Sequence, residues 1–100
     1  MVIDKNEFAT VAIYNGTAKI GITGKYAEKI VEKFGANVVV KENATTRDYP
    51  RSFVVDIDGE GAAMARKLAS DMDCPLVTIM PDGESTPSAD ILVILGGDYR

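Results

Sequence analysis

The chain has 100 residues, 46% of them hydrophobic, which is the usual size of one domain that buries a single core. Its 15 acidic side chains outnumber its 11 basic ones, and the net charge of -4 argues against a protein that binds a nucleic-acid backbone through a basic face. The chain contains no histidine and one cysteine, Cys74, so it lacks the commonest zinc ligands and has no internal disulfide.

The first half of the chain predicts a strand, a helix and a second strand. Residues 8–14 are β-branched and apolar, which indicates a buried strand. In residues 18–34 the apolar side chains recur at helical spacing opposite pairs of unlike charges, which indicates an amphipathic helix. Gly35 is placed to end this helix in the left-handed conformation, and residues 36–41 then predict a second strand.

The middle of the chain predicts a loop, a strand and a second helix. Residues 42–52 are polar and contain a proline, which favours a loop. Residues 53–57 predict a third strand, and Asp58 is placed to cap a helix that runs to about Met72. The expected inner face of this helix consists of Ala62, Ala65, Leu68, Ala69 and Met72.

The last part predicts a strand over residues 75–80, a loop over 81–88 and a very apolar strand over 89–95. The order β-α-β-β-α-β-β predicts an α/β (α+β) domain, a two-layer sandwich in which two helices pack on one mixed sheet. The split β-α-β arrangement is the economical topology, and a three-layer α/β fold is the alternative. Residues 91–95 and 11–13 are expected in the centre of the sheet, because doubly covered strands lose polar alternation.

The turn Asn15-Gly16-Thr17 leads from the first predicted strand toward the first helix. Backbone N–H groups and the helix dipole favour anions at such a place. Residues 16–23 match a phosphate-binding loop except that Ile22 stands where the loop requires its lysine, which excludes nucleotide hydrolysis by that motif.

A structural interpretation of the same segment is preferred. Asn15 and Gly16 would adopt turn geometry, and Thr17 would cap the helix. Gly21 and Gly24, three residues apart on one face, would let the helix pack close to the sheet.

Acidic residues and the cysteine do not indicate catalysis or a metal site. Residues 56–60 lack the ligand spacing of a calcium loop and are explained by capping of a helix. With no histidine to serve as a base, Cys74 is expected to be a small buried side chain. We therefore expect no catalytic residue, no metal and no cofactor.

Two further places are candidates for binding. Asp98 follows Gly96-Gly97 at the end of the most apolar strand, where open α/β sheets often bind ligands, although a solvated strand end explains it as well. The loop over residues 43–52 combines an aromatic ring with cations, which is typical of contact surfaces and also of a flexible exposed loop. The residues concerned are Arg47, Tyr49 and Arg51.

An ordered set of strand, turn and glycine positions resembles the LytR C-terminal domain family over about residues 10–99. The set comprises residues 11–17, Gly21, Gly35, Asn43-Ala44, Tyr49 and residues 90–98. Ser52 stands where this family usually shows a threonine before the third strand. The resemblance implies one domain over residues 9–100, after a disordered or non-native N-terminus over residues 1–8.

The resemblance also implies an extracytoplasmic module of a bacterial cell-envelope protein, following a LytR-CpsA-Psr transferase domain or a single membrane helix. No stretch of these residues has the roughly 20 apolar residues of a membrane helix or the pattern of a signal peptide. A domain from a longer, membrane-anchored protein would have the same sequence. The family has no established catalytic residues to carry over.

The preferred hypothesis is a non-catalytic module that recognises a wall glycopolymer or a partner protein. Its candidate binding residues are Asn15, Gly16, Thr17, Gly21, Arg47, Tyr49, Gly96, Gly97 and Asp98. A structural module that self-associates through an exposed edge strand and positions a neighbouring transferase domain is the alternative. A phosphate-handling enzyme is the remote one, and it would need Lys19 or Lys25 to replace the missing loop lysine.

Overall fold

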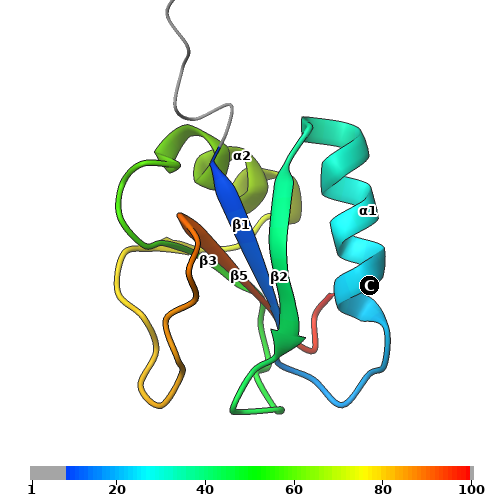
Figure 1. Cartoon of the computed structure of the whole chain (residues 1–100). Helices are drawn as coiled ribbons and strands as arrows, with labels where there is room; N and C mark the ends of the chain where they lie inside the picture. Colours follow the sequence, from blue (N-terminus) through cyan, green and yellow to red (C-terminus); the bar gives the residue numbers. More distant parts are fainter. Residues whose placement is uncertain (1–8, 100) are drawn as a thin grey trace, which may run out of the picture.

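The computed structural model describes residues 9–99, which form a five-stranded mixed sheet with both helices on one face (Figure 1). The prediction for residues 1–8 lies outside the described residues. The elements are β1 (Thr10–Asn15), α1 (Ile22–Phe34), β2 (Asn37–Asn43), β3 (Phe53–Asp56), α2 (Ala62–Met72), β4 (Leu76–Val77) and β5 (Ile91–Leu95).

The strand order is β2-β1-β5-β3-β4, with β5 parallel to β1 and antiparallel to β3. Each helix joins two neighbouring parallel strands, β1 to β2 and β3 to β4. The expected split β-α-β topology is therefore wrong, because β5 inserts between the two units and not within either of them. The two-layer mixed sheet is confirmed, and so is the central position of β5, whose five residues are all fully buried.

One face of the sheet packs against both helices. Tyr26 and Ile30 of α1 and Leu68 of α2 are fully buried against the same set of strand side chains. Of the residues predicted on the inner face of α2, three are buried and Met72 is partly buried; the three are Ala65, Leu68 and Ala69. Met64 is buried in this helix instead of the expected Ala62. Because both helices share this core, the three-layer alternative is wrong.

Loops cover the other face of the sheet. Tyr14, Ile94 and Val55 pack there against side chains of the loops, including Tyr49. Glu84 fastens these loops: its carboxylate accepts hydrogen bonds from the backbone N–H groups of Thr45 (2.7 Å) and Thr46 (3.1 Å) and from the hydroxyl of Tyr49 (2.9 Å). A fully apolar central strand is explained by this double cover.

The helix starts differ from the prediction. α1 begins at Ile22, after Gly21 with φ 82°, and Thr17 does not cap it. α2 begins at Ala62, and Asp58 accepts a hydrogen bond from the N–H of Glu60 (3.0 Å) in a turn before the helix. Polar side chains that bind nearby backbone groups favour such turns over the first turn of a helix.

Of two other predicted boundaries, the end of α1 is confirmed and the extent of β4 is wrong. Gly35 ends α1 in the left-handed conformation (φ 66°), as predicted. The strand predicted over residues 75–80 is only Leu76–Val77, which pairs with Val54 and Val55 of the short β3. Beyond it the chain leaves the sheet, and Ile79 is 79% exposed.

Candidate functional site

Three segments of the chain meet where β1 and β5 end, and we call them the loop junction: Asn15–Thr17, Tyr49–Ser52 and Gly96–Asp98. The N–H of Gly16 donates to the carbonyl of Leu95 (2.9 Å), and the N–H of Tyr49 donates to the carbonyl of Gly16 (3.0 Å). The N–H of Gly97 then donates to the carbonyl of Tyr49 (2.8 Å). The fold thus brings most of the predicted binding residues together.

The polar groups of the first segment are bonded within the chain. The Asn15 side-chain oxygen accepts hydrogen bonds from the backbone N–H (2.9 Å) and the hydroxyl (2.7 Å) of Thr17, and its amide nitrogen donates to the carbonyl of Lys19 (2.6 Å). The hydroxyl oxygen of Thr17 accepts from the N–H of Lys19 (3.0 Å). Asn15 and Thr17 are both buried. This turn therefore stabilises the loop and lies five residues before α1, not at its first turn.

Glycine is needed in the loop junction because other atoms occupy the space of a side chain. A Cβ atom at Gly16 would lie 2.5 Å from the Tyr49 ring and 2.8 Å from the carbonyl oxygen of Leu95. A Cβ atom at Gly96 would overlap the backbone carbonyl of Arg51. Nothing lies within 4 Å of such an atom at Gly21 or Gly24, so the predicted close packing of the helix through these two residues is wrong.

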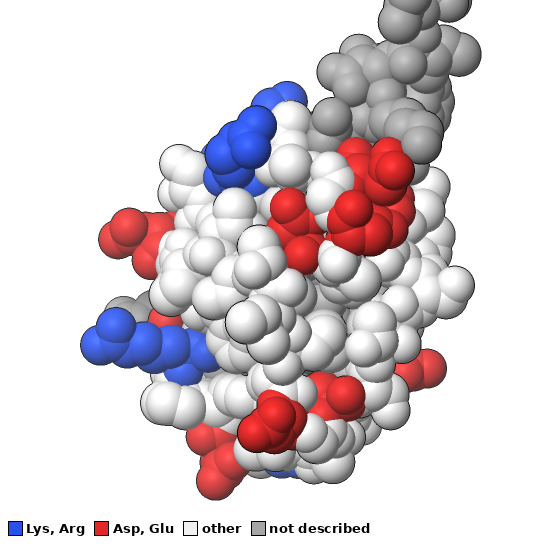
Figure 2. All heavy atoms as spheres, turned by 90° about the vertical axis from the view of Figure 1, so that its left-hand side faces the viewer, with Lys and Arg blue, Asp and Glu red and all other residues white. Residues whose placement is uncertain are grey.

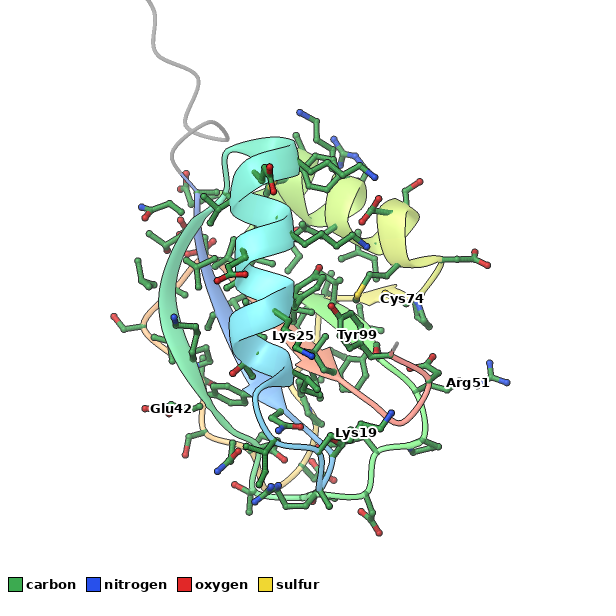
Figure 3. All side chains as sticks on the ribbon, turned by 90° about the vertical axis from the view of Figure 1, so that its right-hand side faces the viewer. Lys19, Lys25, Glu42, Arg51, Cys74 and Tyr99 are labelled. Atoms are coloured by element: carbon green, nitrogen blue, oxygen red, sulfur yellow. The ribbon has the colours of Figure 1, made fainter. Side chains whose placement is uncertain are left out.

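Arg47 and Tyr49 connect the loop over residues 44–52 to its neighbours. Nε of Arg47 donates to the carbonyl of Thr17 (2.7 Å), while the residue as a whole is exposed. Burial and the hydrogen bond to Glu84 raise the pKa of Tyr49 to about 12, so its hydroxyl stays protonated at neutral pH. Arg51 extends outward from this loop (Figure 3).

Asp98 closes the loop junction through Ser52. One carboxylate oxygen of Asp98 accepts hydrogen bonds from the backbone N–H (2.7 Å) and the hydroxyl (2.9 Å) of Ser52. The Ser52 hydroxyl oxygen in turn accepts from the N–H of Gly96 (2.9 Å). The sequence marked Ser52 only as a departure from threonine, and the structure shows what a hydroxyl at this position does.

A hollow of about 210 Å³ lies beside Asp98, between the helices and the C-terminal segment. The ring of Tyr99 meets that of Tyr26 edge-on, with the ring centroids 5.5 Å apart. Tyr26 is fully buried, and its hydroxyl has no hydrogen-bond partner among residues 9–99. The residues that line the hollow are Lys29, Ser52, Asp71, Met72, Asp98 and Tyr99.

Cys74 packs beside this region and is partly buried (Figure 3). Burial, together with the charges of Asp98 and Asp73, raises the pKa of the Cys74 thiol to about 11. A thiol in this state is a poor nucleophile at neutral pH, because the thiolate is the reactive form.

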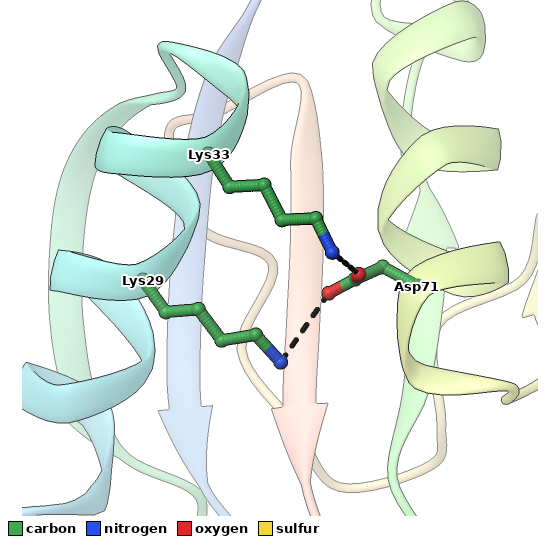
Figure 4. Close-up of polar contacts among 3 residues, drawn as sticks. All are labelled: Lys29, Lys33 and Asp71. Atoms are coloured by element: carbon green, nitrogen blue, oxygen red, sulfur yellow. Dashed lines mark hydrogen bonds and ion pairs between the residues drawn. The ribbon is translucent and has the colours of Figure 1, made fainter.

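Asp71 of α2 lies between two lysines of α1 (Figure 4). Its carboxylate is bonded to Nζ of Lys33 and lies 3.4 Å from Nζ of Lys29. The hydrogen bond from Lys33, opposed by burial and aided by Lys29, lowers the pKa of Asp71. The sequence alone did not predict this contact, although the spacing of four between the lysines places both on one face of α1.

Within residues 9–99 no group of three or more potential ligand side chains is arranged to hold a metal ion. Asp56 instead accepts a hydrogen bond from the N–H of Gly59 (2.9 Å) in a local turn. Neither described helix has the length and apolar content to cross a membrane. On the face drawn in Figure 2, basic side chains lie in two places, near one upper corner and lower on the same side, and acidic side chains are scattered over the face.

The fold and the loop junction together define a small two-layer α/β module. The buried candidate binding residues of the loop junction hold the module's own loops together. The chain belongs to the family described as LytR cell envelope-related transcriptional attenuator, whose family model matches residues 9–99. This confirms the resemblance and associates the chain with the cell envelope, in a family of accessory modules that is not a known catalytic domain. Comparison with curated proteins and with solved structures gives no match.

Proposed function

We propose that the chain is a non-catalytic, extracytoplasmic accessory module of a bacterial cell-envelope protein, and that it recognises a wall glycopolymer. The observation that carries the proposal is the exposed surface around Asp98, which combines a polar hollow with the outer side of the loop junction. Family membership supports the setting in the cell envelope.

Of the candidate binding residues, only the exposed ones can contact the ligand directly. Asn15, Gly16, Thr17 and Gly96 are buried and act as fold residues in this proposal. Gly97, Asp98 and Arg47 are exposed. Beside Thr17 the loop continues through Ile20, whose side chain is 96% exposed. An isoleucine presented in this way on a structured loop supplies an apolar contact for a ligand.

The chemistry of the surface supports binding without catalysis. The Cys74 thiol is protonated at neutral pH, the hydroxyl of Tyr49 is engaged by Glu84, and the chain has no histidine to serve as a base. The ammonium group of Lys19, one of the two lysines considered for phosphate handling, donates to the carbonyl of Tyr99 (3.4 Å).

Co-sedimentation with purified bacterial cell walls tests the proposal, with Ile20→Ser as the variant and Ile79→Ser as its control. Both isoleucines are exposed, but Ile79 follows β4, which lies at one edge of the sheet. We expect Ile20→Ser to weaken binding by about tenfold, since burying one such side chain contributes roughly 1.5 kcal/mol or more, and Ile79→Ser to bind like the wild type. Walls that retain no wild-type protein would contradict the proposal and leave a partner protein as the other ligand class expected from the sequence.

A structural module that self-associates is the second candidate. The outer edge of β2 is unpaired among the described residues, and Val39 at its bulge is 47% exposed. Such an edge can pair with a second copy, although bulges usually oppose this pairing. Analytical ultracentrifugation decides: a dimer at high concentration supports this candidate, and a strict monomer removes it.

A further inference from the structure

The hollow beside Asp98 continues past Asp71 into a groove between the two helices. The groove has a volume of about 570 Å³, and Asp71 lines both depressions. We call the groove the helix furrow. Its chemically distinctive lining residues are Lys33, Phe34, Arg66, Lys67, Ser70 and Asp71.

The helix furrow carries a charge opposite to that of the chain. Its one carboxylate, Asp71, is already bonded to Lys33 and lies against Lys29. Arg66 and Lys67 are exposed and form no ion pair with a carboxylate among residues 9–99. Three cations and one carboxylate thus line the furrow, on a chain whose net charge is -4. Charge complementarity therefore favours an anionic occupant for the furrow.

The furrow also has an apolar wall. Phe34 is partly buried at the end of α1, and Nζ of Lys33 lies 5.5 Å from the centre of its ring. The aliphatic stems of Lys67 and Arg66 add apolar surface beneath their charged ends. An aromatic ring beside cations suits a polymeric ligand whose repeating units have a flat face and carry negative groups.

We propose that the helix furrow binds a phosphate-bearing glycopolymer, with Arg66 and Lys67 contacting phosphate oxygens and Phe34 contacting a sugar face. The proposal rests on the proposed function and names the class of polymer. Arginine offers a paired set of N–H donors and lysine a compact charge, and both suit the several oxygens of a phosphate. The contact between Asp71 and the two lysines joins the helices on either side of the furrow.

Isothermal titration calorimetry of the whole chain with purified poly(N-acetylglucosamine 1-phosphate), whose repeating unit carries both a sugar ring and a phosphate, tests this inference. The variant is Arg66→Gln with Lys67→Gln, and the control is Lys25→Gln with Lys41→Gln, which are exposed cations that line neither the furrow nor the hollow beside Asp98. Each pair takes the net charge from -4 to -6 by removing two positive charges. We expect the furrow pair to weaken binding by about tenfold or more, and the control pair by about twofold or less, because distant exposed charges are screened.

Three outcomes overturn the inference, and they differ from failure of the proposed function. Equal weakening by both pairs means that only net charge matters. Equally tight binding of a polygalacturonate, which carries carboxylates, overturns the assignment of phosphate. If the variant with Arg66→Gln and Lys67→Gln binds cell walls as well as the wild type does, the furrow is not the site and the proposed function stands. If the wild type binds no wall material, the proposed function itself fails.

Discussion

Gly96 and Gly16 are glycines because neighbouring atoms of the chain fill the space of a side chain. At Gly96 the obstacle is the backbone of Arg51, which cannot move aside as a flexible side chain can. Gly24 is the opposite case, since it lies inside α1 with no atom within 4 Å of the Cβ position.

The Gly96→Ala substitution is expected to destabilise the fold by about 3 kcal/mol, because overpacking forces the backbone of the loop junction apart. The Gly24→Ala substitution is the control and is expected to stabilise α1 by about 0.5–1 kcal/mol, because alanine is the better helix former. Urea unfolding of the three proteins measures both effects. If both substitutions change the free energy of unfolding in the same direction, this account of Gly96 is wrong.

Ser52 offers a second test at a single side chain. Ser52→Ala should cost roughly 1–3 kcal/mol, because the buried N–H of Gly96 loses its acceptor and Asp98 loses a donor. Ser52→Thr keeps the hydroxyl and is expected to be clearly more stable than Ser52→Ala. Thermal or urea unfolding of the two variants decides, and equal losses would show that the hydroxyl is not what matters.

For single residues, the sequence predicted which ones lie in the loop junction better than it predicted what their polar groups do there. The residues of the Asn15-Gly16-Thr17 turn do come together with Gly96 and Asp98, as their positions at two strand ends suggested. The bonds between Asn15 and Thr17 are local, but the bond from Gly16 to Leu95 was beyond prediction, because the two residues are 79 apart along the chain and their pairing depends on the final strand order.

Among the elements, α1 and α2 are held together by one acidic side chain between two lysines. Asp71 has only 9% of its side chain exposed, whereas those of Lys29 and Lys33 are about half exposed. The lowered pKa of Asp71 means that the folded state favours its charged form. This contribution to stability is present above the ordinary value of 3.8 and is lost as the pH falls through the lowered pKa.

The Asp71→Asn variant is therefore expected to be less stable than the wild type by about 1 kcal/mol at neutral pH, the magnitude of a partly exposed ion pair. The difference should shrink as the pH falls below 3.8, because the wild-type carboxyl then becomes neutral as well. Chemical unfolding of both proteins over this pH range measures it. A difference that does not depend on pH would mean that packing and not charge explains the effect of the substitution.

Element order was predictable, but connectivity and boundaries were less so. Apolar periodicity located both helices and all five strands, and the fully apolar residues 91–95 correctly indicated the central strand. The start of α1 was predicted too early, because bonds from Asn15 and Thr17 hold the backbone in a turn through Lys19. The split topology was wrong, because periodicity carries no information on which strands are neighbours.

For the whole molecule, the relation between the loop junction and the helix furrow matters most. Asp98 lies in the loop junction and lines the hollow, and Asp71 connects the hollow to the furrow. The C-terminal segment returns to lie beside the start of α1, where Tyr99 packs against Tyr26 (Figure 1). A ligand that extends along this path would contact both surfaces, which the sequence did not place near each other.

Chemical-shift mapping by NMR during titration with soluble wall glycopolymer fragments tests the central claim most directly, because it locates the contact surface on the intact chain. The account predicts dose-dependent shifts at Ile20, Gly97 and Asp98, and at Arg66 and Lys67 when the fragments carry phosphate. An absence of shifts around Gly97 and Asp98 with every fragment would contradict it.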